Sequence, residues 1–386
     1  MQGELRPTDA AQLALDVYTV NANNKRDLQE FLKNRFFHQS NKRKQLTAHV
    51  GGRLFRATKD GFGLCAAGAG AYDGDIFLIF RGTTEANNNA DVVTDARIGI
   101  TLSKTSLPVH MGFNHTFNSM LPDIRQFINE ENCTGTIHCI GHSLGGAVAS
   151  LAADWVSRNT ICQTKLYTFG SPRVGTHWFA SSTSKSIGDA NLHRVYHRTD
   201  PVTMVALYPF MHAPLNSNGH YLFSSDPLTT GAAHKMANYI GSVTGKNWAE
   251  LNDVPEQAYN VESFVEGWLK SKSPVDINSP SFWQWVNSSL IYVLKKVAMG
   301  ALVSLQGVFI NALTLADRIA YILAKSIDLA EHLSIWVELL MRKLMQALGM
   351  KIAATRKELT HSLMKQVLIR LTEKANREAR NALRRL

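Results

Sequence analysis

CIGHSLGGAVASLAADW, residues Cys139–Trp155, places a serine between two glycines and then continues into a series of small residues. The apolar segment Thr136–Ile140 before the serine predicts a strand, and the small-residue segment after it predicts a helix. A strand that turns tightly into a helix at Gly-x-Ser-x-Gly forms a nucleophile elbow, in which the flanking glycines are needed because a Cβ would collide with neighbouring elements. We therefore expect Ser143 to be a nucleophile. A strand-to-helix turn without chemistry is the alternative.

An alternation of strands and helices extends on both sides of this stretch. The uninterrupted apolar run Ile76–Phe80 indicates a strand that is buried on both faces. The pattern predicts a helix at 110–131 and further strands at 165–171 and 192–199. Strands that alternate with helices from about residue 46 to 245 predict an α/β fold with a mostly parallel central sheet covered by helices.

The composition of the chain changes near residue 245, which predicts a division into three parts. Residues 1–245 carry the strand and helix alternation and form the expected α/β domain. Residues 246–287 hold four tryptophans, have no clean period and are expected to form a connector. Residues 288–386 contain no proline and follow a helical pattern, so we expect an all-helical, amphipathic and basic C-terminal region.

Composition and charge exclude several classes of protein. With 45% hydrophobic residues and a mean hydropathy of −0.12, the 386-residue chain is expected to be globular rather than disordered. Residues 351–386 hold ten Lys or Arg and three Glu, so this segment contributes +7 of the formal charge of +10. Because the rest is nearly balanced, no nucleic-acid partner is expected. The four cysteines lack a metal-binding spacing and are expected to be core thiols.

The first twenty residues carry Glu4, Asp9 and Asp16 and lack an uninterrupted apolar core. They therefore do not have the pattern of a cleavable signal peptide. We expect synthesis in the cytoplasm without such a peptide, and export by a specialised secretion system stays open.

Four motifs together carry a family resemblance. GHSLGGAVA, which contains Ser143, is joined by FRGTTE at Phe80–Glu85, FGSPRVG at Phe169–Gly175 and HRTDPV at His197–Val202. In this order and at these spacings the chain resembles the class 3 lipases, the group that includes the fungal triacylglycerol lipases, over about residues 8–245. The resemblance implies an α/β-hydrolase fold and serine esterase chemistry that requires no metal and no organic cofactor.

Asp200 is the candidate acid of a Ser-Asp-His triad. It follows the strand predicted at 192–199, and catalytic groups of α/β sheets lie at the carboxyl ends of strands. The chain order Ser, Asp, His is the one that this fold uses. The alternative is that Asp200 belongs to an ordinary Asp-Pro turn without a catalytic role. Asp226 is then the second candidate acid.

Three histidines follow Asp200, namely His212, His220 and His234. Proximity along the chain favours His212. The resemblance implies instead that the segment at His212 is not catalytic and that the triad histidine comes later, before an aromatic residue on a short final helix. GAAHKMANYI fits that later segment, with Tyr239 near the place of the aromatic residue, so we select His234.

The oxyanion of the tetrahedral intermediate needs hydrogen-bond donors. The first is the backbone N–H of Leu144, which directly follows the nucleophile. The resemblance implies Thr83 as the second donor. It also implies that 85–100 forms a lid over the serine, with Val92, Val93 and Ile98 beneath; a plain surface loop is the alternative.

The C-terminal region bears on the substrate. Val297–Ala316 is free of charge over twenty residues, a length that spans a bilayer, but small or polar residues recur every three or four positions. That stripe favours a helix packed in a bundle or lying in an interface. Basic amphipathic helices bind anionic lipid surfaces. Packing within the region, or binding to a secretion carrier, chaperone or immunity protein, is the alternative for these helices.

These observations lead to one expected function and one rival. We expect a serine esterase that hydrolyses phospholipid or acylglycerol esters through an acyl-enzyme, in peripheral association with a membrane. A bacterial lipase effector that acts on target membranes is the expected setting. The rival is a membrane-active or partner-binding protein in which the C-terminal helices carry the function and the hydrolase is secondary or inactive.

Overall fold

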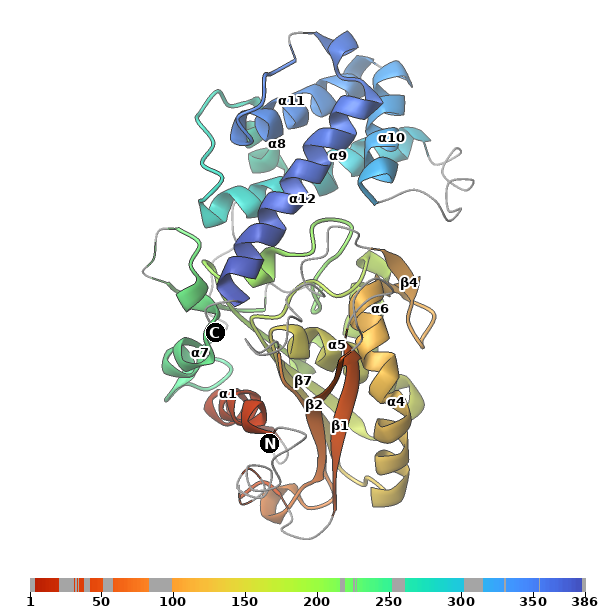
Figure 1. Ribbon diagram of the computed structural model, residues 1–386, viewed down its shortest axis with the longest axis vertical. Coiled ribbons are helices and arrows are strands. Elements are labelled where there is room, and N and C mark those ends of the chain that lie inside the picture. Colours follow the sequence, from red (N-terminus) through yellow and green to blue (C-terminus); the bar gives the residue numbers. More distant parts are fainter. Residues whose placement is uncertain are drawn as a thin grey trace.

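A twisted sheet forms the centre of the first half of the molecule (Figure 1). The computed structural model describes residues 4–20, 31, 33, 35–37, 42–50, 58–82, 99–215, 219–224, 226, 228–251, 261–301, 315–329, 331–353 and 355–383. Within these residues the sheet has seven strands in the order β1-β2-β3-β6-β7-β8-β9. Their bounds are β1 Arg43–Val50, β2 Thr58–Ala67, β3 Ile76–Phe80, β6 Thr136–His142, β7 Gln163–Phe169, β8 Leu192–His197 and β9 His220–Leu222.

The strands from β3 to β9 are parallel, whereas β1, β2 and β3 pair antiparallel. Every residue of β3 and of β6 is buried, as expected for strands with helices on both faces. The prediction of an α/β-hydrolase with a mostly parallel sheet is therefore confirmed.

Two hydrophobic clusters cover the two faces of the sheet. Along β3, Leu78 and Phe80 join the cluster of α4 (Met111–Glu131) and α5 (Leu144–Asn159), while Phe77 and Ile79 join that of α1 (Pro7–Asp16) and α7 (Met236–Val243). This alternation follows from the period of two along a strand. Each such side chain contributes about 1.5–3 kcal/mol on full burial. In Figure 1, α1 and α7 lie on one side of the sheet and α4 on the other.

Short elements complete this part of the chain. β4 and β5 form a small hairpin beside α6, and two 3-10 turns, η4 and η5, lie near the carboxyl edge of the sheet. The bounds are η1 Val17–Thr19, η2 Gly70–Tyr72, β4 Ile100–Leu102, β5 Pro108–His110, α6 His177–Ile187, η3 Asp189–Asn191, η4 Pro201–Met204 and η5 Gly231–His234.

The C-terminal region is helical, with α8 Glu262–Lys270, α9 Pro280–Ala301, α10 Leu315–Leu329, α11 Glu331–Ala347, η8 Arg356–Glu358 and α12 His361–Leu383. Helices thus begin inside the segment predicted as a connector, because its tryptophans pack: Trp268 of α8 and Trp285 of α9 stack with ring centroids 5.9 Å apart. Residues 302–314 of the apolar stretch singled out in the sequence lie outside the described residues. No helix in the described part of the chain is long and apolar enough to cross a membrane.

Helix α12 connects the two halves of the molecule (Figure 1). It packs against α10 and α11 and also against η4 and η5. Ala375, Ala379 and Ala382 lie on one face of the helix and are buried, and such small side chains permit a close approach to neighbouring backbone. The C-terminal region is thereby attached to the two turns that carry the site described next.

Candidate active site

The backbone at Ser143 has the conformation of a nucleophile elbow. Ser143 lies between β6 and α5 with φ 57° and ψ −130°, a strained region for a residue with a side chain. A Cβ on Gly141 would lie 2.2 Å from the carbonyl oxygen of Gly145, and one on Gly145 would lie 2.2 Å from that of Phe80. The two glycines of the motif are therefore required by sterics, as the sequence predicts.

The structure brings the three predicted triad residues together. Oγ of Ser143 lies 2.9 Å from Nε2 of His234, and Nδ1 of His234 lies 2.8 Å from Oδ2 of Asp200. The carboxylate can only accept, so Nδ1–H donates to it and Nε2 is left to accept from the serine hydroxyl. All three residues are fully buried. Ser143 follows β6, Asp200 follows β8, and His234 ends η5, so different carboxyl-end segments supply them.

Tyr239 binds the Asp200 carboxylate, and Gly170 leaves room for it. The sequence assigns neither residue a role at the site. Oδ2 of Asp200 accepts from the Tyr239 hydroxyl at 2.7 Å, and Oδ1 accepts from the Val202 N–H at 2.9 Å. Burial, and secondarily the Asp200 charge, raises the pKa of Tyr239 well above its usual value, so the phenol keeps its proton. A Cβ on Gly170, at φ 57°, would lie 2.7 Å from Asp200 Oδ2 and 3.0 Å from His234 Nδ1. The role of Gly170 could have been predicted from the motif FGSP, Phe169–Pro172, which contains it.

His142, the residue before the predicted nucleophile, holds the backbone of His234. Its Nε2 lies 2.8 Å from the carbonyl oxygen of His234, and its Nδ1 lies 2.7 Å from the Tyr18 hydroxyl. Because a carbonyl only accepts, Nε2–H donates to it, and Nδ1 accepts from Tyr18. Burial and the nearby His234 lower the pKa of His142 well below its usual value, which keeps the ring neutral. Nothing in the N-terminal sequence pointed to Tyr18.

Of the two predicted oxyanion donors, Leu144 is described and Thr83 is not. Leu144 is the first residue of α5, where helical N–H groups have no partner within the helix. Thr83 and residues 85–98 of the expected lid lie outside the described residues. Gly82 is described, and a Cβ on it would lie 2.8 Å from the Cβ of Ser143. The chain that leads to Thr83 thus passes directly beside the serine.

The alternative site residues have partners elsewhere. Nε2–H of His212 donates to the carbonyl oxygen of Thr203 at 3.0 Å, and Nε2 of His220 lies 3.1 Å from Nδ1 of His193. Asp226 is exposed. Among the described residues, His, Cys, Asp and Glu form no group of three that could hold a metal ion.

Comparison with known proteins identifies the matching segment. The family model described as Lipase (class 3) matches residues 77–210, which include Ser143 and Asp200 and end before His234. The chain is 33% identical over 123 residues to secreted mono- and diacylglycerol lipase 1 of Fusarium solani, covering 31% of this chain and 35% of that protein. It is 30% identical over 135 residues to secreted mono- and diacylglycerol lipase A of Penicillium camembertii, covering 34% and 43%. The match thus spans about a third to two fifths of the length of these curated relatives.

Solved lipase structures match over a longer part of the chain and less closely. Lip2 lipase from Yarrowia lipolytica aligns at 22% identity with a TM-score of 0.41, covering 57% of this chain and 79% of that one. Lipase II from Rhizopus niveus aligns at 20% identity with a TM-score of 0.37, covering 60% and 86%. By the family model and the curated relatives, residues 77–210 of this chain are similar to the class 3 lipase family.

Proposed function

We propose that this protein is a serine hydrolase that cleaves carboxylic esters of lipids through an acyl-enzyme. The observation that carries the proposal is the continuous hydrogen-bonded chain from Ser143 Oγ through His234 to Asp200. Nucleophile, base and orienting carboxylate in this order are the parts that acyl transfer by a serine requires. The match of residues 77–210 to the class 3 lipase family model supports the same reaction class.

The reaction proceeds in two halves. Ser143 Oγ attacks the ester carbonyl while His234 Nε2 accepts its proton, and the Asp200 carboxylate stabilises the imidazolium that forms. The backbone N–H of Leu144 and a donor at Thr83 receive the oxyanion; losing one such donor costs about 3–4 kcal/mol. The alcohol leaves with the proton from His234, and water then hydrolyses the acyl-enzyme by the same steps.

The donors around Asp200 suit this role. Val202 N–H, the Tyr239 hydroxyl and His234 Nδ1–H all donate to its two oxygens in a fully buried setting. Such donors stabilise the negative charge that burial alone would disfavour. This hydrogen-bonding arrangement suits Asp200 to stabilise a charged His234.

We propose a lipid surface as the location of the substrate. Leu102, Met111 and Trp178 are 61%, 51% and 64% exposed. They lie on β4, at the start of α4 and on α6, and β5 joins these elements: Pro108 pairs with Leu102 and accepts from the N–H of Thr176. Exposed large apolar side chains that gather in this way are typical of contact with membranes or other partners.

Acylglycerols and phospholipids are both candidate substrates. The curated relatives are named mono- and diacylglycerol lipases, which favours acylglycerols. The basic C-terminal segment favours an anionic phospholipid surface. The setting of an exported bacterial effector, and a carrier, chaperone or immunity protein that binds the C-terminal helices, stay predictions from the sequence.

The decisive experiment measures fatty-acid release from defined monoacylglycerol, diacylglycerol, triacylglycerol and phosphatidylcholine dispersions. Wild type should release fatty acid and Ser143→Ala should not. Ser157→Ala is the matched control, because Ser157 lies on the same helix and its hydroxyl only donates to the Asp154 carbonyl and contacts Ser186. If wild type releases none from any ester while wild type and Ser143→Ala bind or permeabilise vesicles equally, the C-terminal helices carry the function instead.

A further inference from the structure

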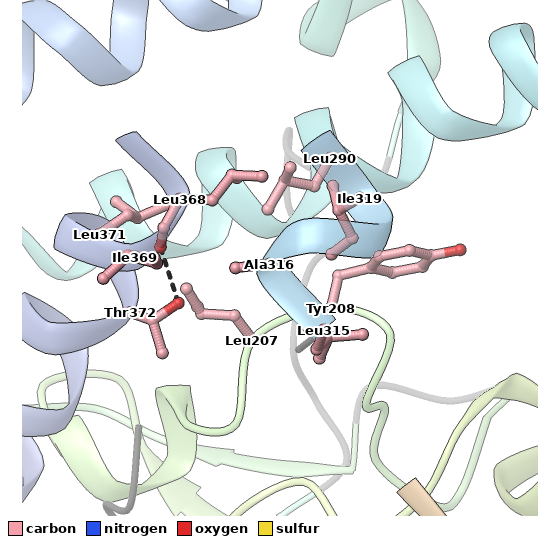
Figure 2. Close-up of a pocket in the computed structure, with 10 residues that line it drawn as sticks. All are labelled: Leu207, Tyr208, Leu290, Leu315, Ala316, Ile319, Leu368, Ile369, Leu371 and Thr372. Atoms are coloured by element: carbon pink, nitrogen blue, oxygen red, sulfur yellow. Dashed lines mark hydrogen bonds between the residues drawn. The ribbon is translucent and has the colours of Figure 1, made fainter. Parts of the chain in front are cut away.

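A cavity of about 140 Å³ lies between the hydrolase and the C-terminal helices. Figure 2 shows its lining side chains, which come from the loop after η4 and from α9, α10 and α12. Leu207 and Tyr208 line it from the loop, and Leu290, Ile319, Leu368 and Leu371 line it from the helices. The cavity therefore exists because the C-terminal region packs onto the hydrolase.

The lining is suited to hydrocarbon and not to water. Its polar members are Tyr208 and Thr372, and the Thr372 hydroxyl donates to the carbonyl oxygen of Leu368 on its own helix (Figure 2). None of the described lining residues carries a charge. A water molecule needs two to four polar partners to occupy a cavity, and apolar cavities of roughly 150 Å³ stay dry and bind benzene. A hydrocarbon segment of about six carbons therefore fits this volume.

The loop and the helix α12 that line the cavity are connected to the segments that hold the proposed acid, Asp200, and the proposed base, His234. Leu207 follows Asp200 by seven residues, so chain geometry places their Cα atoms at most about 25 Å apart. Helix α12, which supplies Leu368 and Leu371, packs against η4, which directly follows Asp200, and against η5, which ends at His234. A ligand in the cavity thus contacts the loop that follows η4 and the helix α12 that packs on η4 and η5.

Resting on the proposed esterase function, we propose that this cavity binds the hydrocarbon end of the substrate's acyl chain. The C-terminal helices then set the chain-length preference of the hydrolase. Leu290, Ile319 and Leu368 all lie outside residues 77–210, the part of the chain that the family model matches. The C-terminal region, which the family model does not match, therefore supplies most of the proposed acyl site.

The first test fills the cavity. Ala316 lines it from α10, so Ala316→Phe should occupy its volume. We expect kcat/KM for p-nitrophenyl palmitate to fall about 10-fold or more relative to that for p-nitrophenyl butyrate, the scale of discrimination by hydrophobic pockets. Ala324→Phe makes the same change on the same helix at a partly buried position that does not line the cavity, and should leave this ratio unchanged.

The second test measures binding without turnover. Ser143→Ala protein should bind dodecanoate in isothermal titration calorimetry, and adding Ala316→Phe should weaken that binding about 10-fold. Ile369→Ala, at a partly buried lining position, enlarges the cavity and should shift the ester preference toward longer chains. Circular dichroism confirms that each variant is folded.

The outcomes distinguish the proposed acyl site from the proposed esterase function. Hydrolysis with an unchanged palmitate to butyrate ratio in Ala316→Phe, together with unchanged dodecanoate binding, overturns the acyl site and leaves the esterase intact. An absence of hydrolysis of any ester overturns the proposed function, whereas dodecanoate binding that depends on Ala316 would still establish a hydrocarbon site.

A second, independent observation concerns two of the four cysteines. Cys133 lies between α4 and β6, and Cys162 lies between α5 and β7. The two strands pair from Thr136 and Gln163 onward, so the two turns are adjacent, and the Cys162 thiol donates to the carbonyl oxygen of Cys133 at 3.2 Å. Both residues are only partly buried, unlike Cys65 and Cys139, which are fully buried.

We infer that Cys133 and Cys162 form a disulfide in an oxidising environment. The two thiols lose two protons and two electrons, and a small-molecule disulfide such as oxidised glutathione accepts them and leaves as two thiols. Burial, and secondarily the contact with Cys162, raises the pKa of Cys133 to about 12, so exchange is expected to be slow at neutral pH and faster as the pH rises. The pair lies at the amino ends of β6 and β7, whereas Ser143 follows the carboxyl end of β6.

Mass spectrometry tests this pairing on the full chain incubated with oxidised glutathione at pH 8.5. We expect the loss of two hydrogens, a Cys133–Cys162 cross-linked peptide, and a melting temperature raised by about 5 °C or more. Cys133→Ser should show neither the cross-link nor the shift and should keep wild-type ester hydrolysis. Glutathione adducts on Cys133 or Cys162 without a cross-link, or an unchanged mass, would overturn the pairing.

Discussion

The ring of His142 donates a hydrogen bond from Nε2 to the backbone carbonyl of His234 across 2.8 Å. The residue before the proposed nucleophile therefore holds the backbone of the proposed base, and the two rings pack with centroids 4.5 Å apart. Tyr18, from a turn near the N-terminus, completes this arrangement by donating to Nδ1 of His142. Tyr18 and His142, which are more than 100 residues apart in the chain, thus together fix the position of His234.

Replacement of His234 should abolish hydrolysis. His234→Ala removes the group that accepts the Ser143 proton, and losses of about 10⁴-fold or more in kcat follow the removal of such a group. His212→Ala should lower activity only as far as it lowers the folded fraction, because His212 bonds to Thr203. Fatty-acid release by both folded variants checks this, and near-normal turnover by His234→Ala would refute the assignment.

Tyr18→Phe should lower kcat and leave KM nearly unchanged. The substitution leaves Nδ1 of buried His142 without its donor, and an unsatisfied buried group costs about 1–3 kcal/mol. We expect a reduction of about 10-fold in kcat, since His234 loses part of its support. Tyr221→Phe, on β9, makes the same change away from the site and should keep wild-type kinetics. Equal kinetics for the two variants would show that the Tyr18 contact is not used.

Gly170→Ala should abolish the proposed ester hydrolysis. The added Cβ would lie 2.7 Å from Asp200 Oδ2 and 3.0 Å from the Tyr239 hydroxyl, so the carboxylate must shift. We expect at least about 100-fold lower kcat, the scale that a displacement of about 1 Å causes. Gly188→Ala is the matched control: it shares a positive φ of 85°, but its Cβ would only approach the Asn191 side chain, at 3.6 Å. That variant should lose about 1–2 kcal/mol of stability and keep its activity. Similar kcat values for the two would contradict the steric explanation.

Acid should destabilise the fold through His110. Its Nδ1 accepts from the N–H groups of Gly112 and Phe113 and so caps α4, which requires a neutral ring. Burial lowers the pKa of His110 from 6.5 to about 3. The unfolded chain therefore binds a proton below pH 6.5 that the folded chain does not, and stability falls as the pH drops from 6.5 toward 3. The loss from this residue is about 2 kcal/mol at pH 5.

Urea unfolding at pH 7.5 and pH 5 measures this effect. His110→Asn keeps a side chain that caps helices and removes the titrating group, so its stability should depend less on pH than that of wild type by about 2 kcal/mol over this range. An equal pH dependence of the two proteins would mean that other buried histidines account for the acid sensitivity.

Local sequence patterns were sufficient for most of the fold. The uninterrupted apolar residues of Ile76–Phe80 predict burial on both faces because side-chain direction alternates along a strand, and every residue of β3 is buried. The start of the C-terminal helices was harder to place. Trp268 and Trp285 interrupt any clean period in the sequence, yet they stack on each other between α8 and α9.

The sequence by itself determined the elbow at Ser143, because the constraint is local: glycines at 141 and 145 admit the close backbone approach that the turn requires. The residues after Asp200 left three histidines open, and only the family resemblance selected among them. Tertiary structure decided that His234 reaches Ser143, since that contact joins residues 91 positions apart. It also decided the supporting parts, Tyr18, His142, Gly170 and Tyr239, and the packing of α12 on η4 and η5. Periodicity reports which face of an element is buried, but not which distant side chain meets it there.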